Sequence, residues 1–128
     1  MERIVIEGKM LTKRKEMIII SDDGLTINGG YYFPTVTLLG PVPWDCISSA
    51  RAVRVIFDKY LWVVISDVPG LTEIIGEEAV QKCLLKVRKT GEMVLSVDLQ
   101  SCKLNGLDPA ALINEHAKGI FHAENAEE

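Results

Sequence analysis

Apolar residues along most of the chain come in short runs, which are separated by turns rich in glycine, proline and aspartate. Runs of roughly four to eight residues that are rich in β-branched and aromatic side chains are typical of strands. The pattern predicts about seven strands, at residues 3–7, 16–20, 25–28, 35–40, 47–57, 60–67 and 93–99. Short turns join antiparallel neighbours, so we expect a mainly antiparallel β fold.

The connections between these strands carry characteristic turn residues. Residues 21–24 should form a hairpin turn in which Gly24 supplies a positive φ. A second tight turn is predicted at residues 58–59, and residues 8–15 form a polar connection. Residues 41–45 contain two prolines, which remove ladder donors, so this stretch cannot be a central strand.

Two segments show helical spacing. Within residues 71–89, apolar side chains recur at i, i+3, i+4 and i+7, but Gly76 interrupts the segment and leaves one helix or two open. The second helix is predicted at residues 108–121. There Asp108 is a favourable N-cap, and Pro109 fits the first helical position because its missing N–H costs nothing.

Length and charge limit the classes of function. The chain has 128 residues, which fits one domain over residues 1–121 followed by an acidic flexible tail at 122–128. The net charge of −4 disfavours a bulk attraction to nucleic acid or to an anionic membrane. We therefore expect no nucleic-acid partner, and membrane contact that is at most peripheral.

The cysteines indicate a reducing compartment. Cys46, Cys83 and Cys102 are odd in number and widely spaced, so they fit reduced, buried thiols better than a disulfide framework. No stretch approaches the roughly 18 apolar residues that a membrane-spanning helix needs. The expected location is the cytoplasm.

Four short motifs follow one another in a characteristic order. They are an acidic-glycine turn at residues 22–25, a Pro-Trp-acidic step at 43–47, an apolar strand ending in aspartate at 60–67, and a final strand at 94–99 that leads to the capped helix. In this order the chain resembles a family of uncharacterised bacterial proteins with a pleckstrin-homology-like (PH-like) domain. The resemblance covers roughly residues 16–121.

The resemblance carries expectations about fold and function. It implies an α+β, mainly β fold, in which two nearly orthogonal sheets form a partly open antiparallel barrel and the C-terminal helix closes one end. The helix at about 71–89 would be an insertion. Many relatives carry two membrane helices near the start, where this chain has the short polar segment 8–15. Membrane tethering is therefore not implied, and the family offers no catalytic residues to transfer.

Basic residues between the first two predicted strands form one candidate site. In lipid-binding pleckstrin-homology domains, cations in this connection hold inositol phosphates, and several cations in a short turn can bind a multivalent phosphate. The alternative interpretation is a solvated turn that keeps a strand edge soluble. The residues are Lys9, Lys13, Arg14 and Lys15.

Aromatic residues form the second candidate site. Tyr31, Tyr32 and Phe33 follow two glycines and are the best candidates for an exposed patch that mediates self-association. Trp44 is either an anchor at the start of the next strand or an exposed recognition residue. Trp62 lies in the middle of the strongest strand and is expected in the core.

Catalytic and metal sites have little support. His116 fits the apolar side of the closing helix, and a Cys46 nucleophile would need a base within hydrogen-bond reach. Asp67 and Asp98 could in principle pair as acid and base, although surface carboxylates are far commoner. No cofactor or metal is expected.

These patterns favour a non-catalytic interaction module. It would bind a protein partner or itself through an exposed strand edge, since adding a strand to an open edge is a natural mode of recognition for a sheet. The alternative is binding of an anionic ligand or lipid headgroup by the basic residues at 9–15. A small enzyme is the third hypothesis, which would need a polar pocket with a perturbed titrating group.

Overall fold

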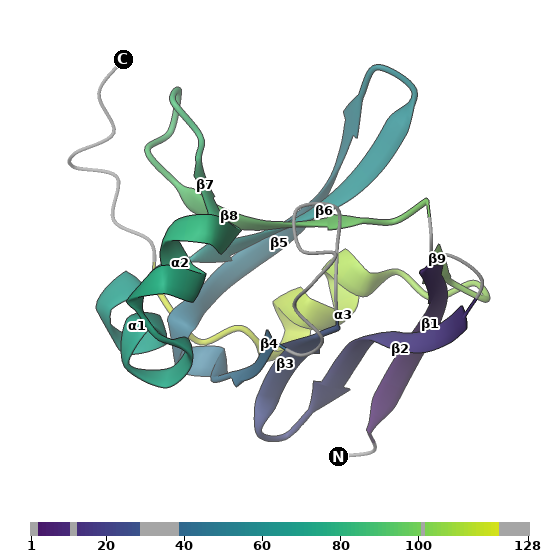
Figure 1. Cartoon of the computed structure of the whole chain (residues 1–128), viewed down its shortest axis with the longest axis horizontal. Helices are drawn as coiled ribbons and strands as arrows, with labels where there is room; N and C mark the ends of the chain where they lie inside the picture. Colours follow the sequence, from purple (N-terminus) through teal and green to yellow (C-terminus); the bar gives the residue numbers. More distant parts are fainter. Residues whose placement is uncertain (1–2, 11–12, 29–38, 101, 121–128) are drawn as a thin grey trace.

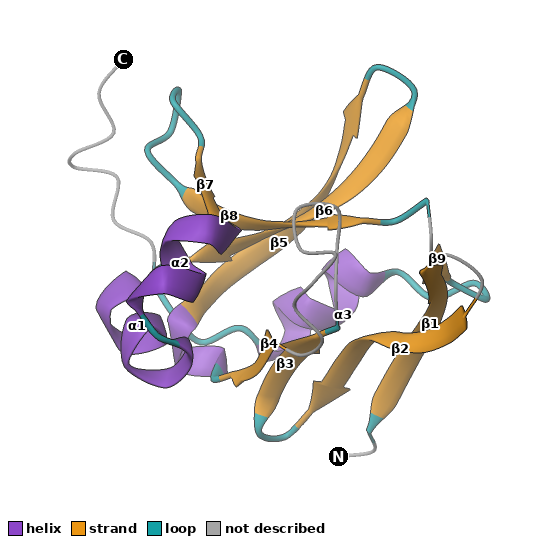
Figure 2. Ribbon diagram, viewed as in Figure 1, coloured by secondary structure: helices purple, strands orange, loops and turns teal. Residues whose placement is uncertain are grey.

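The computed structural model describes residues 3–10, 13–28, 39–100 and 102–120. Within these residues the chain forms two antiparallel sheets and three α-helices, so the fold is α+β and mainly β. Figure 2 shows the two sheets as separate layers, with two helices gathered at one end of the molecule. Tyr31, Tyr32 and Phe33 and the predicted tail at 122–128 lie outside the described residues.

The first sheet has the strand order β4-β3-β2-β1-β9. Its strands are β1 (Ile4–Met10), β2 (Lys13–Ser21), β3 (Gly24–Ile27), β4 (Leu39–Val42) and β9 (Cys102–Lys103). The predicted hairpin turn before β3 is confirmed, with Gly24 at φ +142°. The proline-containing strand β4 lies at the sheet edge, as its missing ladder donor requires.

The predicted polar connection at residues 8–15 is wrong in extent. β1 continues to Met10 and β2 begins at Lys13, and the two strands pair along this whole stretch. A shift in register after Ile6 accommodates the extra residue of β2. Polar composition misled the prediction because the outer half of a hairpin needs no apolar side chains to keep its backbone ladder.

The second sheet has the strand order β5-β6-β8-β7. Its strands are β5 (Ile47–Val55), β6 (Asp58–Ile65), β7 (Leu84–Lys86) and β8 (Met93–Asp98). The tight turn between β5 and β6 consists of Ile56 and Phe57, not of residues 58–59 as predicted. The observed register places Ile47 opposite Ile65, whereas a turn at 58–59 would leave the start of β5 beyond the end of β6.

The predicted helical segment at 71–89 is two short helices followed by a strand. They are α1 (Val68–Ile75) and α2 (Glu77–Cys83), and Gly76 between them has φ +94°. The expectation that the helix continues to Lys89 is wrong, because Leu84–Lys86 form β7 instead. Leu84 pairs with Leu95 of β8 and is buried there, so a contact distant in the sequence replaces another helical turn.

The closing helix α3 (Pro109–His116) begins as predicted and ends earlier. Asp108 caps it by accepting a hydrogen bond from the Ala111 N–H at 3.3 Å. The helix stops five residues before Phe121, because the backbone from Ala117 is extended. This extended segment runs beside the short 3₁₀ helix η1 (Trp44–Cys46) and the start of β5.

The core lies where the two sheets and α3 meet. Fully buried side chains come from both sheets, from α1 and from α3. They include Ile6, Ile18, Leu61, Leu71, Leu95 and Ile113. No closed barrel forms from the described strands, and no helix in that part of the chain is long and apolar enough to cross a bilayer.

Candidate functional site

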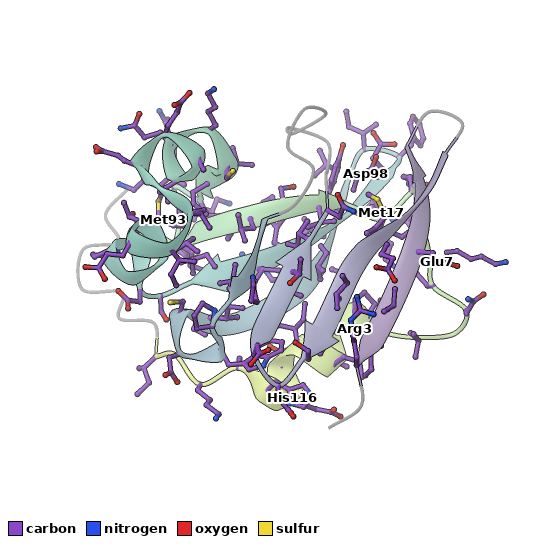
Figure 3. All side chains as sticks on the ribbon, turned by 60° about the horizontal axis from the view of Figure 1, so that its bottom comes forward. Arg3, Glu7, Met17, Met93, Asp98 and His116 are labelled. Atoms are coloured by element: carbon purple, nitrogen blue, oxygen red, sulfur yellow. The ribbon has the colours of Figure 1, made fainter. Side chains whose placement is uncertain are left out.

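Trp44 is an anchor of the fold and not an exposed recognition residue. Its side chain is only 6% exposed, and its Nε1–H donates a 2.8 Å hydrogen bond to the carbonyl oxygen of Ser21. The ring of His116, which Figure 3 labels on α3, has its centroid 5.3 Å from that of Trp44. The indole therefore joins the β2–β3 turn to the end of α3, and the recognition hypothesis for this residue is corrected.

The backbone brings the predicted basic residues to one end of the β1–β2 hairpin. Lys9 lies opposite Arg14, Lys13 lies opposite Met10, and Lys15 lies opposite Gly8. Three of the four basic positions therefore belong to β2, and Lys9 faces them from β1. The sequence prediction that these residues share one place in the fold is consistent with this register.

The candidate catalytic groups have structural roles. Asp67 caps α1 by accepting the Gly70 N–H at 2.9 Å, and Asp98 accepts the Gln100 N–H at 2.8 Å. Desolvation raises the pKa of Cys46, with neighbouring carboxylates adding to the effect. Burial raises the pKa of Cys83 and of Cys102 to about 11.

The protonated thiols that result are poor nucleophiles at neutral pH. Among the described residues, no three histidine, cysteine or carboxylate side chains gather in a way that could hold a metal ion.

The outer edge of β5 is divided into a capped half and an open half. In the capped half, the side-chain amide of Asn114 takes the place of a neighbouring strand. Its Oδ1 accepts the Ala50 N–H at 2.8 Å, and its Nδ2 donates to the Ala50 carbonyl at 2.9 Å. Further along, the Gly119 N–H donates to the Ile47 carbonyl at 2.8 Å. These contacts satisfy the inner half of the edge.

Gly119 can make this contact because it has no side chain. A Cβ at this position would lie 2.7 Å from the Asp45 carbonyl oxygen and 2.9 Å from that of Ile47. Backbone atoms cannot move aside to relieve such a clash, whereas the end of a flexible side chain could. The described chain after α3 therefore lies against the start of β5, and its contacts run from Ala50 towards Ile47, away from Ala52.

The open half of the edge begins at Ala52. Along an antiparallel strand, alternate residues direct their N–H and C=O groups to the same side. Ala50 directs both groups outward to Asn114, so Ala52 and Arg54 direct theirs outward as well. No described residue of the chain hydrogen-bonds to these four backbone groups.

A hollow lies beside the open edge. It has a volume of about 210 Å³, and it separates the hairpin from the loop that leads to α3. Ala52 and Lys59 line it from the hairpin, and Asp108 and Pro109 from the start of the helix. Apolar side chains form the rest of the lining, namely Leu99, Leu104, Leu107 and Ala110.

The opposite face of the hairpin carries a fixed ion pair. The Arg51 guanidinium donates two hydrogen bonds to the Glu92 carboxylate, at 2.9 and 3.3 Å, and lies 5.5 Å from the centre of the Trp62 ring. Trp62 is half-buried on this face, because alternation along β6 sends Leu61 and Val63 to the core instead. The prediction that Trp62 belongs to the core is therefore wrong.

The ion pair makes stability depend on pH. The hydrogen bond from Arg51 lowers the pKa of Glu92 below its ordinary value of 4.5, with a smaller contribution from Thr90. A lowered carboxyl pKa stabilises the fold above about pH 4.5, and this stabilisation disappears as the pH falls through the folded-state pKa. We expect Glu92→Gln to cost about 1 kcal/mol at pH 7 and progressively less below pH 4.5, measured by urea unfolding.

The matched control for this prediction is Glu78→Gln. Glu78 also forms a 2.9 Å ion pair, with Lys82, but both side chains are exposed on α2. Water and salt screen such pairs, so this substitution should leave the free energy of unfolding unchanged both at pH 7 and below pH 4.5. An equal loss for both variants, or a Glu92→Gln loss that is independent of pH, would contradict the assignment.

The hairpin tip is the part of the site that the sequence prediction missed. The sequence pattern predicts Ile56 and Phe57 at the end of a strand. In the structure they form the turn, and they are 82% and 88% exposed. The signal that could have found them is the break in alternation at residues 55–57, where three apolar residues follow one another. Asn114 has no comparable signal, because it caps a strand 64 residues away.

Comparison of the chain with protein-family models, with curated proteins and with solved structures finds no match.

Proposed function

We propose that this chain is a non-catalytic, PH-like interaction module that binds an extended segment of a protein partner along the outer half of β5. The open backbone groups of Ala52 and Arg54 carry the proposal. An extended segment adds to a sheet edge through such groups, and these hydrogen bonds supply affinity without requiring a particular sequence.

The hollow supplies the specificity. Side chains of an added strand alternate between the two faces of the sheet, so every second one would point to the face that carries Ala52. There the hollow of about 210 Å³ has space for a single apolar side chain against Leu104 and Leu107. Lys59 and Asp108 at its rim offer one charge of each sign to flanking polar groups.

The capped half of the edge sets the limits of the site. Asn114 and the chain at Gly119 occupy the edge as far as Ala50, so an incoming segment can pair only from Ala52 outward. This restricts pairing to a few residues and disfavours a large dimer interface built from two copies of this edge, since stable interfaces bury at least about 1,200 Å². A short linear segment of another protein is the better fit.

The proposal is tested with selected peptides. Random nine-residue peptides are selected on the purified protein, and an enriched peptide is titrated against the wild type and Ala52→Pro. Proline removes the outward N–H and obstructs the approach of a strand, while edge positions tolerate it. We expect at least tenfold weaker binding, with little change in the melting temperature.

Ala52→Ser is the matched control, because it keeps the backbone N–H and should bind as the wild type does. Equal binding of the peptide by Ala52→Pro, or a selection that enriches no peptide, would contradict the proposed site.

A second candidate is anion binding at the end of the β1–β2 hairpin. The observation that favours it is the register, which places Lys9 opposite Arg14. Like charges directly opposite each other destabilise a sheet, and a bound anion would relieve this cost. Salt-sensitive binding of inorganic phosphate that Arg14→Glu removes would support this candidate, and binding that Arg14→Glu leaves unchanged would exclude it.

A further inference from the structure

The tip of the β5–β6 hairpin is apolar and points away from the molecule. Ile56 and Phe57 are 82% and 88% exposed, and the neighbouring Val55 is 45% exposed. The hairpin projects from the body of the molecule at the top of Figure 1, as the β7–β8 loop does at some distance from it. Single exposed apolar residues are common on proteins, but large adjacent ones at a projecting tip indicate a surface that becomes buried against something.

The backbone of the tip has a conformation that is unfavourable for the residue in it. Ile56 has φ +58°, a left-handed conformation that is unfavourable for a β-branched residue. The first of the two turn residues has a positive φ and the second does not, a pattern in which hairpins normally place glycine first. A glycine would form the turn more easily, so the isoleucine side chain serves something other than the turn.

Two cations lie behind this apolar tip, one pair of residues further back than Val55 and Asp58. Arg54 pairs opposite Lys59 across the hairpin, and both side chains are exposed. They occupy a pair without mutual backbone hydrogen bonds, where opposed side chains come closest. Like charges in such positions repel each other, and an anion between them would remove that repulsion.

No described carboxylate forms an ion pair with Arg54 or Lys59, although Asp108 lines the same hollow as Lys59. Asp58, the carboxylate at the tip itself, accepts a hydrogen bond from the Tyr60 hydroxyl at 3.5 Å. The β7–β8 loop lies towards the other end of β6, where Met93 pairs with Ile65. On this loop Arg88 and Lys89 are exposed, whereas Glu92 is engaged by Arg51. This loop extends in the same direction as the hairpin in Figure 1.

We propose that the β5–β6 tip binds an anionic lipid surface, with Ile56 and Phe57 entering the interface and Arg54 and Lys59 contacting lipid phosphates. Apolar side chains at the greatest depth, with cations two residues behind them, follow the order of acyl chains and headgroups at a bilayer surface. Arg88 and Lys89 add a weaker, longer-range attraction. This inference goes beyond the proposed function, because it does not use the open backbone groups of β5.

Vesicle flotation tests this inference. The protein is mixed with vesicles of phosphatidylcholine alone, or of phosphatidylcholine and phosphatidylglycerol in equal amounts. We expect binding to the mixed vesicles only, weakened by added salt. Phe57→Ser should reduce it at least tenfold, because the apolar contact is lost. The double substitution Arg54→Glu, Lys59→Glu should reduce it as strongly.

Two control variants make these results specific. Ile74→Ser removes another exposed apolar side chain, on α1, and should leave vesicle binding unchanged. Lys82→Glu reverses an exposed cation on α2, far from the tip in the sequence, and should also leave it unchanged. Ala52→Pro should still bind vesicles, so that failure of the edge proposal and failure of the lipid proposal can be told apart. Each variant is first shown to keep the wild-type melting temperature.

Several outcomes would overturn the inference. Equal binding to neutral vesicles, or binding that Phe57→Ser leaves intact, would exclude the tip as an anionic-lipid contact. Absence of vesicle binding, together with light scattering that shows a wild-type dimer and a Phe57→Ser monomer, would assign the tip to contact between copies of the chain.

Discussion

Replacing Trp44 with alanine should lower the free energy of unfolding by about 3–5 kcal/mol, the usual cost of removing a buried aromatic ring. The indole is 6% exposed and lies between the β2–β3 turn and the end of α3. Its loss leaves a cavity and also leaves the Ser21 carbonyl without its donor. Urea unfolding followed by circular dichroism measures the change.

Trp44→Phe separates these two contributions. It keeps most of the apolar contact and removes the donor to Ser21. The free energy of unfolding should therefore fall by about 1 kcal/mol more than the smaller ring alone would cause. A Trp44→Ala variant that unfolds like the wild type would contradict the anchoring role, and it would return this residue to the list of recognition candidates.

Replacing Asn114 with leucine should lower the free energy of unfolding by about 2–4 kcal/mol. The side chains are similar in size, but leucine cannot cap the edge of β5. The N–H and the carbonyl of the buried Ala50 both lose their partners. Leaving such groups unsatisfied costs more than the hydrogen bonds contribute when they form.

Asn114→Asp provides the internal control for this prediction. A carboxylate still accepts the Ala50 N–H but cannot donate to the Ala50 carbonyl, so the loss should be at least half of that for leucine. If Asn114→Leu were neutral in urea unfolding, the division of the β5 edge into a capped and an open half would be unsupported.

Local sequence signals predicted the elements that depend on local physics. Asp108 and Pro109 mark the start of α3 because a cap and a fixed φ act within one helical turn. Gly24 marks a turn because its φ of +142° suits few other residues. The run of apolar residues in β2 is buried on both faces, which is consistent with its lack of alternation.

The errors arise where distant contacts override local preference. Leu84 fits the apolar spacing of a helix equally well, but pairing with Leu95 makes it a strand residue. The β5–β6 turn lies two residues earlier than predicted, because Ile47 pairs with Ile65 in the core. A local pattern contains neither of these partners.

The candidate site was largely beyond sequence prediction for the same reason. An open edge is defined by what does not pair with it, and the cap at Ala50 comes from Asn114 at a separation of 64 residues. The residues that sequence did indicate have other positions: Trp44 supports the fold, and the basic cluster lies on the other hairpin. The break in alternation at residues 55–57 is a local signal of the exposed tip, but only the register of β5 shows which of these residues form the turn.

Amide hydrogen exchange of the free protein, followed by NMR, tests the central claim most directly. The account predicts that the Ala50 amide exchanges slowly, since Asn114 accepts its hydrogen bond, and that the amides of Ala52 and Arg54 exchange rapidly. Addition of a selected peptide should then protect Ala52 and Arg54 alone. Equally slow exchange at all three positions in the free protein would show that the edge is already occupied and would contradict the account.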